Sequence, residues 1–217
     1  GVGGGYIGVD VFFVLSGYLI TSLLLKELDE TGTISFTKFY ARRARRLLPA
    51  MAVVLFVTTV VSLVIYSPLE QDRFANTSLA TATYLSNVYF ARASTDYLAA
   101  PSQTNPLLHT WSLSVEEQFY FLWPLLVFLA TSSLAGRRRE RSHVFGAVVG
   151  IAVLSLALSV YLTGTRQPWA FFLFPARAWE FAIGAVAVLP WPWGAASCAG
   201  QPGRRQLAAG WLGLAGI

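Results

Sequence analysis

Residues 47–66 read LLPAMAVVLFVTTVVSLVIY and contain no charged side chain. A helix that crosses the hydrocarbon core of a bilayer needs about 20 mostly apolar residues, so this stretch predicts a membrane span. An apolar tail from about residue 206 predicts a further, incomplete span. The sequence therefore predicts an all-α fold, a polytopic transmembrane helix bundle with about five complete spans and one partial span. The other complete spans are predicted at about 7–25, 118–135, 144–162 and 169–189.

The composition also indicates a protein that lies in lipid. Of the 217 residues, 55% are hydrophobic and 12% are charged, whereas a soluble protein has about 25% charged residues. Much of the surface must therefore face membrane lipid. Cys198 is the single cysteine, which excludes an internal disulfide framework and a Cys-rich metal site. No group of His, Cys and carboxylate residues has the spacing of metal ligands, so we predict no metal.

Basic residues gather in alternate loops between the predicted spans. Because cytoplasmic loops carry an excess of Lys and Arg, the larger group marks the cytoplasmic side. We therefore expect the chain to start outside, to cross inward at 7–25, and to expose an external loop at about 67–115. An outside start implies at least one earlier span. The larger group is Lys26, Lys38, Arg42, Arg43, Arg45, Arg46, Arg137, Arg138, Arg139, Arg141, Arg204 and Arg205, and the smaller group is Arg73, Arg92 and Arg166.

The net charge of +5 could suggest a nucleic-acid partner. These arginines lie between hydrophobic spans, however, where basic residues act as topology anchors. We therefore predict no nucleic-acid binding.

Asp10 lies at the outer edge of the first predicted span, after the glycine-rich residues 3–8. Aspartate is well suited to cap a helix N-terminus, by hydrogen bonding and by its charge. An ionisable group at a span is also costly and tends to mark function. The sequence leaves both interpretations open, a helix cap and a member of a catalytic site.

Residues 109–120 read HTWSLSVEEQFY and open a predicted helix. Ser112 and Glu116 lie four residues apart and so share one helix face. A polar turn this dense needs a protein partner or water, although Ser112 could be an N-cap and Glu116 a favourable charge near the helix start. His109 has the chemistry of a general base, but a histidine at the membrane surface needs no such role.

Arg177 and Glu180 lie inside the predicted span at about 169–189, at a spacing that allows them to pair. An ion pair used only for stability gains little in an apolar interior, because desolvating two charges often costs more than their attraction returns. We therefore predict that these two residues line a cavity.

The basic segment, residues 39–49, reads FYARRARRLLP and is compatible with a helix up to its proline. Arg43 and Arg46 share one helix face, as do Arg42 and Arg46. Guanidinium groups in this arrangement can bind phosphates through bidentate hydrogen bonds. Anionic lipid headgroups are the alternative partner, and spacing alone does not separate the two.

Together these segments resemble the acyltransferase family 3 of multi-spanning membrane O-acyltransferases. The resemblance covers nearly all of the chain. It rests on four blocks in the family's order, GGYIGVDVFFVLSGYLI at 4–20, FYARRARRLLP at 39–49, HTWSLSVEEQFY at 109–120 and RAWEF at 177–181.

The resemblance implies a domain of about ten spans in the bacterial cytoplasmic membrane. Such a domain takes an acyl group, often acetyl, from cytosolic acyl-CoA and delivers it to a hydroxyl of a cell-surface glycan or a related acceptor. Arg43 and Arg46 match the family's R-x-x-R pair, which favours the phosphates of CoA as the ligand of Arg42, Arg43 and Arg46. Glu116 and Glu180 match acidic positions of the family motifs.

One departure from the family pattern concerns the base. The family's catalytic histidine lies on the span before the Gly-Gly block, with a basic residue about three helical turns before it, and neither lies in this sequence. His109 is not that residue. We predict that Asp10 or Glu116 orients the histidine and that Arg177 stabilises charge nearby. The predicted catalytic group is therefore Asp10, Glu116, Arg177 and Glu180.

Two alternative functions remain open from the sequence. The first is a membrane transporter or flippase-like carrier of an anionic or glycan-lipid substrate, in which the buried charges line a path and the arginines bind lipid. The second is an inactive fragment.

Overall fold

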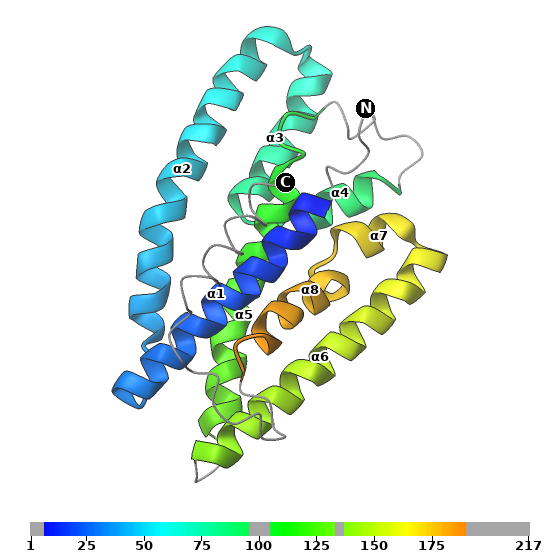
Figure 1. The fold of residues 1–217 in the computed structure, drawn as a ribbon. Coiled ribbons are helices and arrows are strands. Elements are labelled where there is room, and N and C mark those ends of the chain that lie inside the picture. Colours follow the sequence, from blue (N-terminus) through cyan, green and yellow to red (C-terminus); the bar gives the residue numbers. More distant parts are fainter. Residues whose placement is uncertain (1–6, 96–104, 133–136, 190–217) are drawn as a thin grey trace, which may run out of the picture.

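The computed structural model describes residues 7–95, 105–132 and 137–189. This part of the chain folds into helices and contains no strand, and Figure 1 shows the longer helices packed side by side. The predicted all-α class is therefore confirmed. The helices are α1 (Ile7–Thr31), α2 (Phe36–Ile65), α3 (Pro68–Ala82), α4 (Ser86–Ala93), α5 (Thr110–Ser132), α6 (Arg137–Thr165), α7 (Gln167–Phe172) and α8 (Phe174–Val186).

Within the residues that the structure describes, four helices are long and apolar enough to cross a membrane, namely α1, α2, α5 and α6. They include most of the predicted spans at 7–25, 47–66, 118–135 and 144–162. Within the predicted external loop at 67–115, the structure places two further helices, α3 and α4. The partial span predicted from about residue 206 lies outside the described residues.

The segment at about 169–189, which the sequence predicts as one span, forms two helices in the structure, α7 and α8, and not one continuous helix. Leu173 interrupts the helix with an extended backbone, at φ −79° and ψ 132°. Pro175 follows in the first turn of α8. Its ring lacks an N–H group and disfavours helical conformations just before it, so a helix readily begins at a proline and rarely continues through one. Neither α7 nor α8 is long enough to cross a bilayer alone.

The helices α1 and α8 pack at very close range through two glycines. A side chain at Gly17 would collide with the backbone carbonyl of Phe181, and one at Gly184 would collide with the carbonyl of Val14. Small residues allow helix backbones to approach in this way in membranes, where dispersion and hydrogen bonds drive association. Phe181 stacks between Phe13 of α1 and Phe119 of α5, with ring centroids 4.6 and 4.2 Å apart. The core therefore lies where α1, α5 and α8 meet.

By contrast, α2 lies at the edge of the bundle (Figure 1). It continues through Pro49, so the basic segment and the predicted span at 47–66 form one helix. Its apolar side chains are largely exposed, for example Phe56 at 70% and Val64 at 83%. This surface suits lipid.

A capping box starts α3. The backbone N–H and the hydroxyl of Ser67 donate to Oε2 of Glu70, at 2.9 and 2.7 Å. These hydrogen bonds stabilise the ionised carboxylate and lower the pKa of Glu70 below its ordinary value of 4.5. The segment between α2 and α5 therefore has a defined helical start.

Candidate active site

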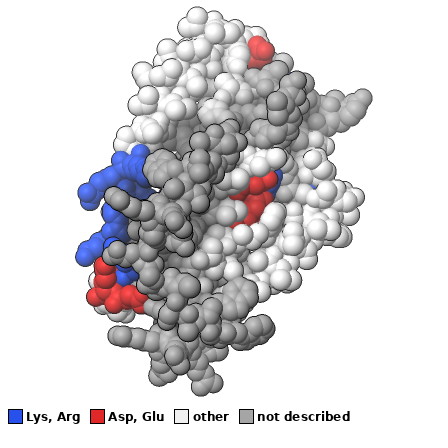
Figure 2. Space-filling model, in the orientation of Figure 1, with Lys and Arg blue, Asp and Glu red and all other residues white. Residues whose placement is uncertain are grey.

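Asp10 of α1 and Glu180 of α8 bind the same guanidinium group. Nη1 of Arg177 donates to Oδ1 of Asp10 at 2.6 Å and to Oε1 of Glu180 at 2.7 Å. Glu180 is 1% exposed, the Arg177 side chain 13% and the Asp10 side chain 42%. Figure 2 shows acidic and basic atoms side by side in the middle of an otherwise uncharged region of the face. We call these three residues the charged triad.

The geometry separates the alternatives for Asp10. The residue lies in the first turn of α1, and its carboxylate pairs with Arg177 on a distant helix. Asp10 is therefore not the N-cap of this helix. The contact predicted between Arg177 and Glu180 from their spacing is present.

The interruption at Leu173 is what positions Arg177. Where a helix ends inside a bundle, its last carbonyls need hydrogen-bond donors. Nε of Arg177 donates to the carbonyl of Phe171 at 3.1 Å, and Nδ2 of Asn87 donates to that of Phe172 at 3.1 Å. The Arg177 side chain is thus fixed by three acceptors, two carboxylates and one backbone carbonyl. The helix break and the charged triad form one structural unit.

The charge of the triad is not balanced. With both carboxyl groups ionised, two negative charges face one guanidinium. Oε2 of Glu180 is also buried and accepts no hydrogen bond from the described residues. Buried polar atoms are nearly always paired, so this oxygen is available to a proton donor or a cation. The half-exposed Asp10 makes the triad reachable from the surface.

Glu116 belongs to a second polar group that joins α5 to α1. Its Oε1 accepts hydrogen bonds from the hydroxyl of Ser16 at 2.6 Å and from the hydroxyl of Tyr120. Further along the same two helices, Nε1 of Trp123 donates to the hydroxyl of Thr21 at 2.9 Å. Glu116 is 6% exposed, so it is a buried link between helices. Ser16 and Tyr120 were missed by sequence reasoning, because nothing local distinguishes them from ordinary span residues.

Ser112 does not join Glu116. Its hydroxyl donates to the backbone carbonyl of His109 at 3.2 Å, and the His109 side chain is exposed. The shared helix face predicted for Ser112 and Glu116 therefore does not produce one polar site.

Other polar residues of α5 bind the segment that contains α3 and α4. The hydroxyl of Thr110 lies 3.1 Å from that of Thr81, and the hydroxyl of Ser114 lies 2.7 Å from that of Ser86. These contacts attach α3 and α4 to α5.

Asn87 was also missed as a site residue. Nε2 of Gln118 donates to Oδ1 of Asn87 at 2.9 Å and to the carbonyl of Tyr84 at 3.0 Å. Asn87 is fully buried and also binds the carbonyl of Phe172 at the helix break. The four-residue spacing of Thr110, Ser114 and Gln118 was the available signal for a partner, although it did not reveal which segment the partner was.

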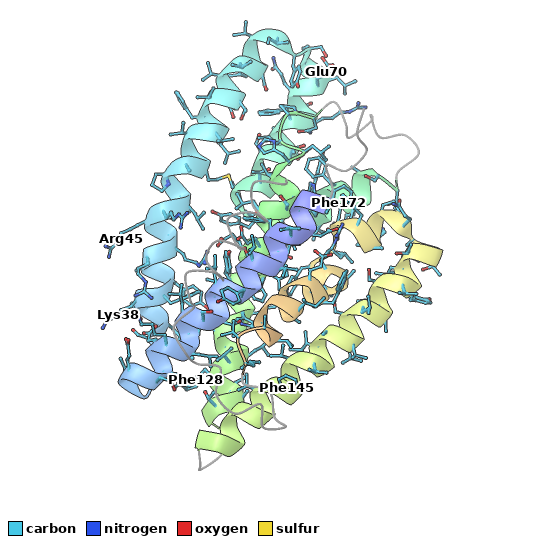
Figure 3. All side chains as sticks on the ribbon, viewed as in Figure 1. Lys38, Arg45, Glu70, Phe128, Phe145 and Phe172 are labelled. Carbon is cyan, nitrogen blue, oxygen red and sulfur yellow. The ribbon has the colours of Figure 1, made fainter. Side chains whose placement is uncertain are left out.

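The basic segment does not bring Arg42, Arg43 and Arg46 to one point. The guanidinium carbon of Arg43 lies 3.3 Å from the ring centroid of Tyr120, a cation–π contact. Arg42 lies 3.9 Å from Glu27 on α1, and Arg46 is exposed. Figure 2 shows the basic side chains of this region along one edge, beside acidic ones, and Figure 3 shows Lys38 and Arg45 pointing away from the bundle.

The fold and these polar groups define a class. A carboxylate on the long apolar helix α1 meets a guanidinium and a carboxylate on α8, and ionisable groups are retained at such positions mainly for function. The chain is therefore a membrane protein with a polar site built between its helices. A family model described as an acyltransferase domain matches residues 2–199, and the chain belongs to this family.

Curated relatives agree with the family. The chain is 38% identical over 189 residues to a Staphylococcus aureus (strain COL) protein named "Putative O-acetyltransferase SACOL0978", covering 87% of this chain and 31% of the relative. It is 34% identical over 193 residues to the peptidoglycan O-acetyltransferase OatA of Listeria monocytogenes, covering 87% of this chain and 30% of OatA. The chain thus spans less than a third of the length of these relatives. No solved structure matches it.

No described part of the chain contains three or more His, Cys, Asp or Glu side chains arranged to hold a metal ion. The two carboxylates of the triad are joined by a guanidinium instead.

Proposed function

We propose that this chain forms part of a bacterial cytoplasmic-membrane O-acyltransferase. It transfers an acyl group, acetyl in the simplest case, from acyl-CoA to a hydroxyl of a cell-surface glycan. The observation that carries the proposal is the charged triad, a polar site held among spanning helices in a chain of the acyltransferase family. The OatA relative is named for peptidoglycan, which supports a glycan acceptor.

The reaction needs a base and a group that stabilises negative charge. The acceptor hydroxyl loses its proton to a base as its oxygen attacks the thioester carbonyl. The new C–O bond forms, the C–S bond breaks, and CoA leaves as the thiol after taking up a proton. The developing oxyanion needs a nearby donor or positive charge.

The chain's own residues support these steps in different ways. Asp10 is the exposed member of the triad, so its carboxylate can orient the base by accepting its N–H, as a carboxylate does beside a catalytic imidazole. Arg177 supplies positive charge and holds Asp10 and Glu180 in place. Glu116 positions α1 against α5 through Ser16.

The donor needs a phosphate site at the cytoplasmic end. Arg42, Arg43 and Arg46 are the basic residues that we assign to the CoA phosphates. Arg46 and Arg42 are exposed at the surface of α2, whereas Arg43 is turned toward α5. Guanidinium groups bind phosphate oxygens in pairs of hydrogen bonds, which suits this partner.

The test is acyl transfer in bacterial membranes that carry the protein. Radiolabelled acetyl-CoA should lose its label to an ester-linked glycan product. Alanine at Asp10, Glu116 or Arg177 should lower the rate at least tenfold with normal membrane insertion, the loss being largest for Arg177. Arg166→Ala, an exposed arginine before α7, is the matched control and should keep the wild-type rate.

Two results would contradict the proposal. Wild-type rates in all three alanine variants would remove the triad and Glu116 from the reaction. Movement of a glycan lipid across the membrane without consumption of the thioester would show a carrier instead.

A further inference from the structure

A cavity lies between α2 and α5; no member of the charged triad lines it, but its wall includes Tyr120, whose hydroxyl donates to Glu116. Its volume is about 460 Å³, within the range of roughly 300–1,000 Å³ that is typical of small-molecule sites. Arg43 and Leu47 line it from α2, and Glu117 and Phe121 line it from α5. The turn at residues 83–85 forms its third wall. Most of the wall surface is apolar, although several lining side chains carry a polar group.

The cavity joins two parts of the protein that the proposed function needs to connect. Arg43 belongs to the basic segment, which the distribution of Lys and Arg places on the cytoplasmic side. The turn at 83–85 belongs to the segment between α2 and α5, which the same rule places outside. A ligand with its anionic head near Arg43 would therefore extend toward the outer side.

Glu117 brings a carboxylate with an unpaired oxygen to the wall of this cavity. Its Oε1 is buried and accepts no hydrogen bond from the described residues. The neighbouring residues are already paired, since Glu116 binds Ser16 and Gln118 binds Asn87. Buried acceptors without a partner are rare in native proteins. The sequence singled out Glu116, but the structure places Glu117 at the cavity.

Tyr84 lines the cavity from the turn that contacts α5, and the pKa of its phenol responds to the Glu117 carboxylate. Burial, and after it the negative charge of Glu117, raise the pKa of the Tyr84 phenol above its ordinary value of 10.0. Its backbone has a positive φ of 54°, and its carbonyl is held by Gln118. The turn is thus a fixed wall and not a loose loop.

We propose that this cavity holds the acyl-bearing arm of the thioester donor, an inference that rests on the proposed function. The anionic head of the donor lies toward Arg43. Glu117 is a positioning residue, whose carboxylate accepts a hydrogen bond from an amide N–H of the arm. The acyl end lies against the turn at 83–85, so Leu85 limits the acyl length that the protein accepts.

A lipid chain is the competing occupant, because the cavity opens between α2 and α5. Leu48 and Phe121 at its rim are 54% and 67% exposed. A lipid chain and an acyl arm share an apolar body with an anionic head. They differ in their effect on the reaction. The shape of the cavity affects which acyl group is transferred only if the cavity holds the donor.

The experiment measures butyryl and acetyl transfer from their CoA thioesters in membranes. Leu85→Trp and Leu47→Trp fill the cavity from two different walls and should lower the butyryl-to-acetyl ratio about tenfold, since one or two methylene groups in a shaped pocket are worth this much. Leu85→Ala should raise the ratio by a similar factor. Leu79→Trp is the control, because Leu79 is 66% exposed on α3 and does not line the cavity.

Glu117 has its own pair of variants. Glu117→Gln keeps a carbonyl oxygen as acceptor, whereas Glu117→Leu removes it. We expect Glu117→Leu to raise the KM for acetyl-CoA about tenfold, the value of one good hydrogen bond, with Glu117→Gln close to wild type. A fall in kcat in both variants at unchanged KM would contradict the positioning role.

The outcomes separate this inference from the proposed function. If the wild-type protein transfers acyl groups but the ratio is unchanged in both tryptophan variants, the cavity does not hold the acyl arm. If a tryptophan variant fails to accumulate, Leu85→Ala replaces it in the test. An unchanged butyryl-to-acetyl ratio in Leu85→Ala then overturns the inference. Bound lipid that is displaced by Leu85→Trp, with the donor preference unchanged, identifies a lipid site and also overturns it. Absence of any thioester-dependent transfer by the wild type contradicts the proposed function itself.

Discussion

The helices α1 and α2 both have the length and hydropathy of a membrane span, yet they relate to the bundle differently. In the spanning window of α1, 33% of the residues are buried, against 11% for α2. Polar side chains on α1 face protein partners, as Asp10 does with Arg177 and Ser16 with Glu116. The middle of α2 presents apolar side chains outward, and its arginines lie near one end.

This difference indicates that the two regions have different roles. The junction of α1, α5 and α8 has closely packed rings and paired polar groups, so it can hold catalytic atoms in one geometry. The helix α2 borders a cavity and is joined to α5 by few contacts, such as the hydrogen bond from the Tyr40 hydroxyl to the carbonyl of Phe121 at 2.8 Å. A loosely held helix next to a fixed core is suited to admitting a ligand. Two substitution tests probe this contrast, and a third probes the start of α3.

The largest effect is expected at the contact between α1 and α8. Gly17→Leu would force the two helices apart, because the new side chain meets the backbone of α8 and not a flexible side chain. We expect a loss of at least about 3 kcal/mol in stability, the upper end for overpacking, together with loss of the ion pair between Asp10 and Arg177. Thermal unfolding in detergent and the rate of acyl transfer measure both consequences.

Gly150→Leu on α6 is the matched control. Gly150 is exposed, and a side chain there would meet no atom within 4 Å. The control should keep or raise the unfolding temperature, because leucine favours a helix over glycine by roughly 0.5–1 kcal/mol. Equal destabilisation by the two substitutions would show that the close contact is not needed.

A smaller effect is expected from removing one ring in each region. Phe119 of α5 is 1% exposed, whereas Phe56 of α2 is 70% exposed. In lipid the unfolded helices also surround a phenylalanine with apolar atoms, so only the packing part of its burial is lost on truncation. We expect Phe119→Ala to cost about 2 kcal/mol, somewhat less than the 3–5 kcal/mol seen in water-soluble cores.

The control in this pair is Phe56→Ala, which should leave stability within about 0.5 kcal/mol of wild type, as exposed positions do. Chemical unfolding in mixed micelles compares the two variants directly. A large loss at Phe56 would mean that α2 packs against protein and not lipid in the membrane.

The contrast between α1 and α2 was only partly visible in the sequence. Hydropathy predicted the spans at 7–25 and 47–66 equally well, because it records how apolar a segment is and not what covers it. The contact between Arg177 and Glu180 followed from their spacing on one helix. Asp10 joins them only in the fold, since helices far apart in the chain meet through Gly17 and Gly184.

The broken helix shows the same limit. Hydropathy averaged over 169–189 hides an interruption at Leu173, although Pro175 was a local signal for it. The interruption matters because backbone carbonyls in the last turn of α7 accept hydrogen bonds from Arg177 and Asn87. Glu117 was indistinguishable from Glu116 in the sequence, because only the neighbouring helices decide which carboxylate is paired.

The smallest effect is expected at the start of α3, where the capping box responds to pH. The folded-state pKa of Glu70 lies below its ordinary value of 4.5, so the folded protein favours the ionised carboxylate. A lowered pKa contributes stability that is present above pH 4.5 and is lost as the pH falls through the folded-state pKa. In Glu70→Gln the protection of the first-turn amides of α3 should therefore differ from wild type at pH 7 and should converge with it as the pH falls below 4.5.

Hydrogen exchange of these amides measures the effect, with Asp72→Asn as the control because no Ser67 hydrogen bond involves Asp72. Because Glu70 is fully exposed, only a local change in protection is expected, and a pH-independent difference between wild type and Glu70→Gln would show that the ionised carboxylate is not what stabilises the cap.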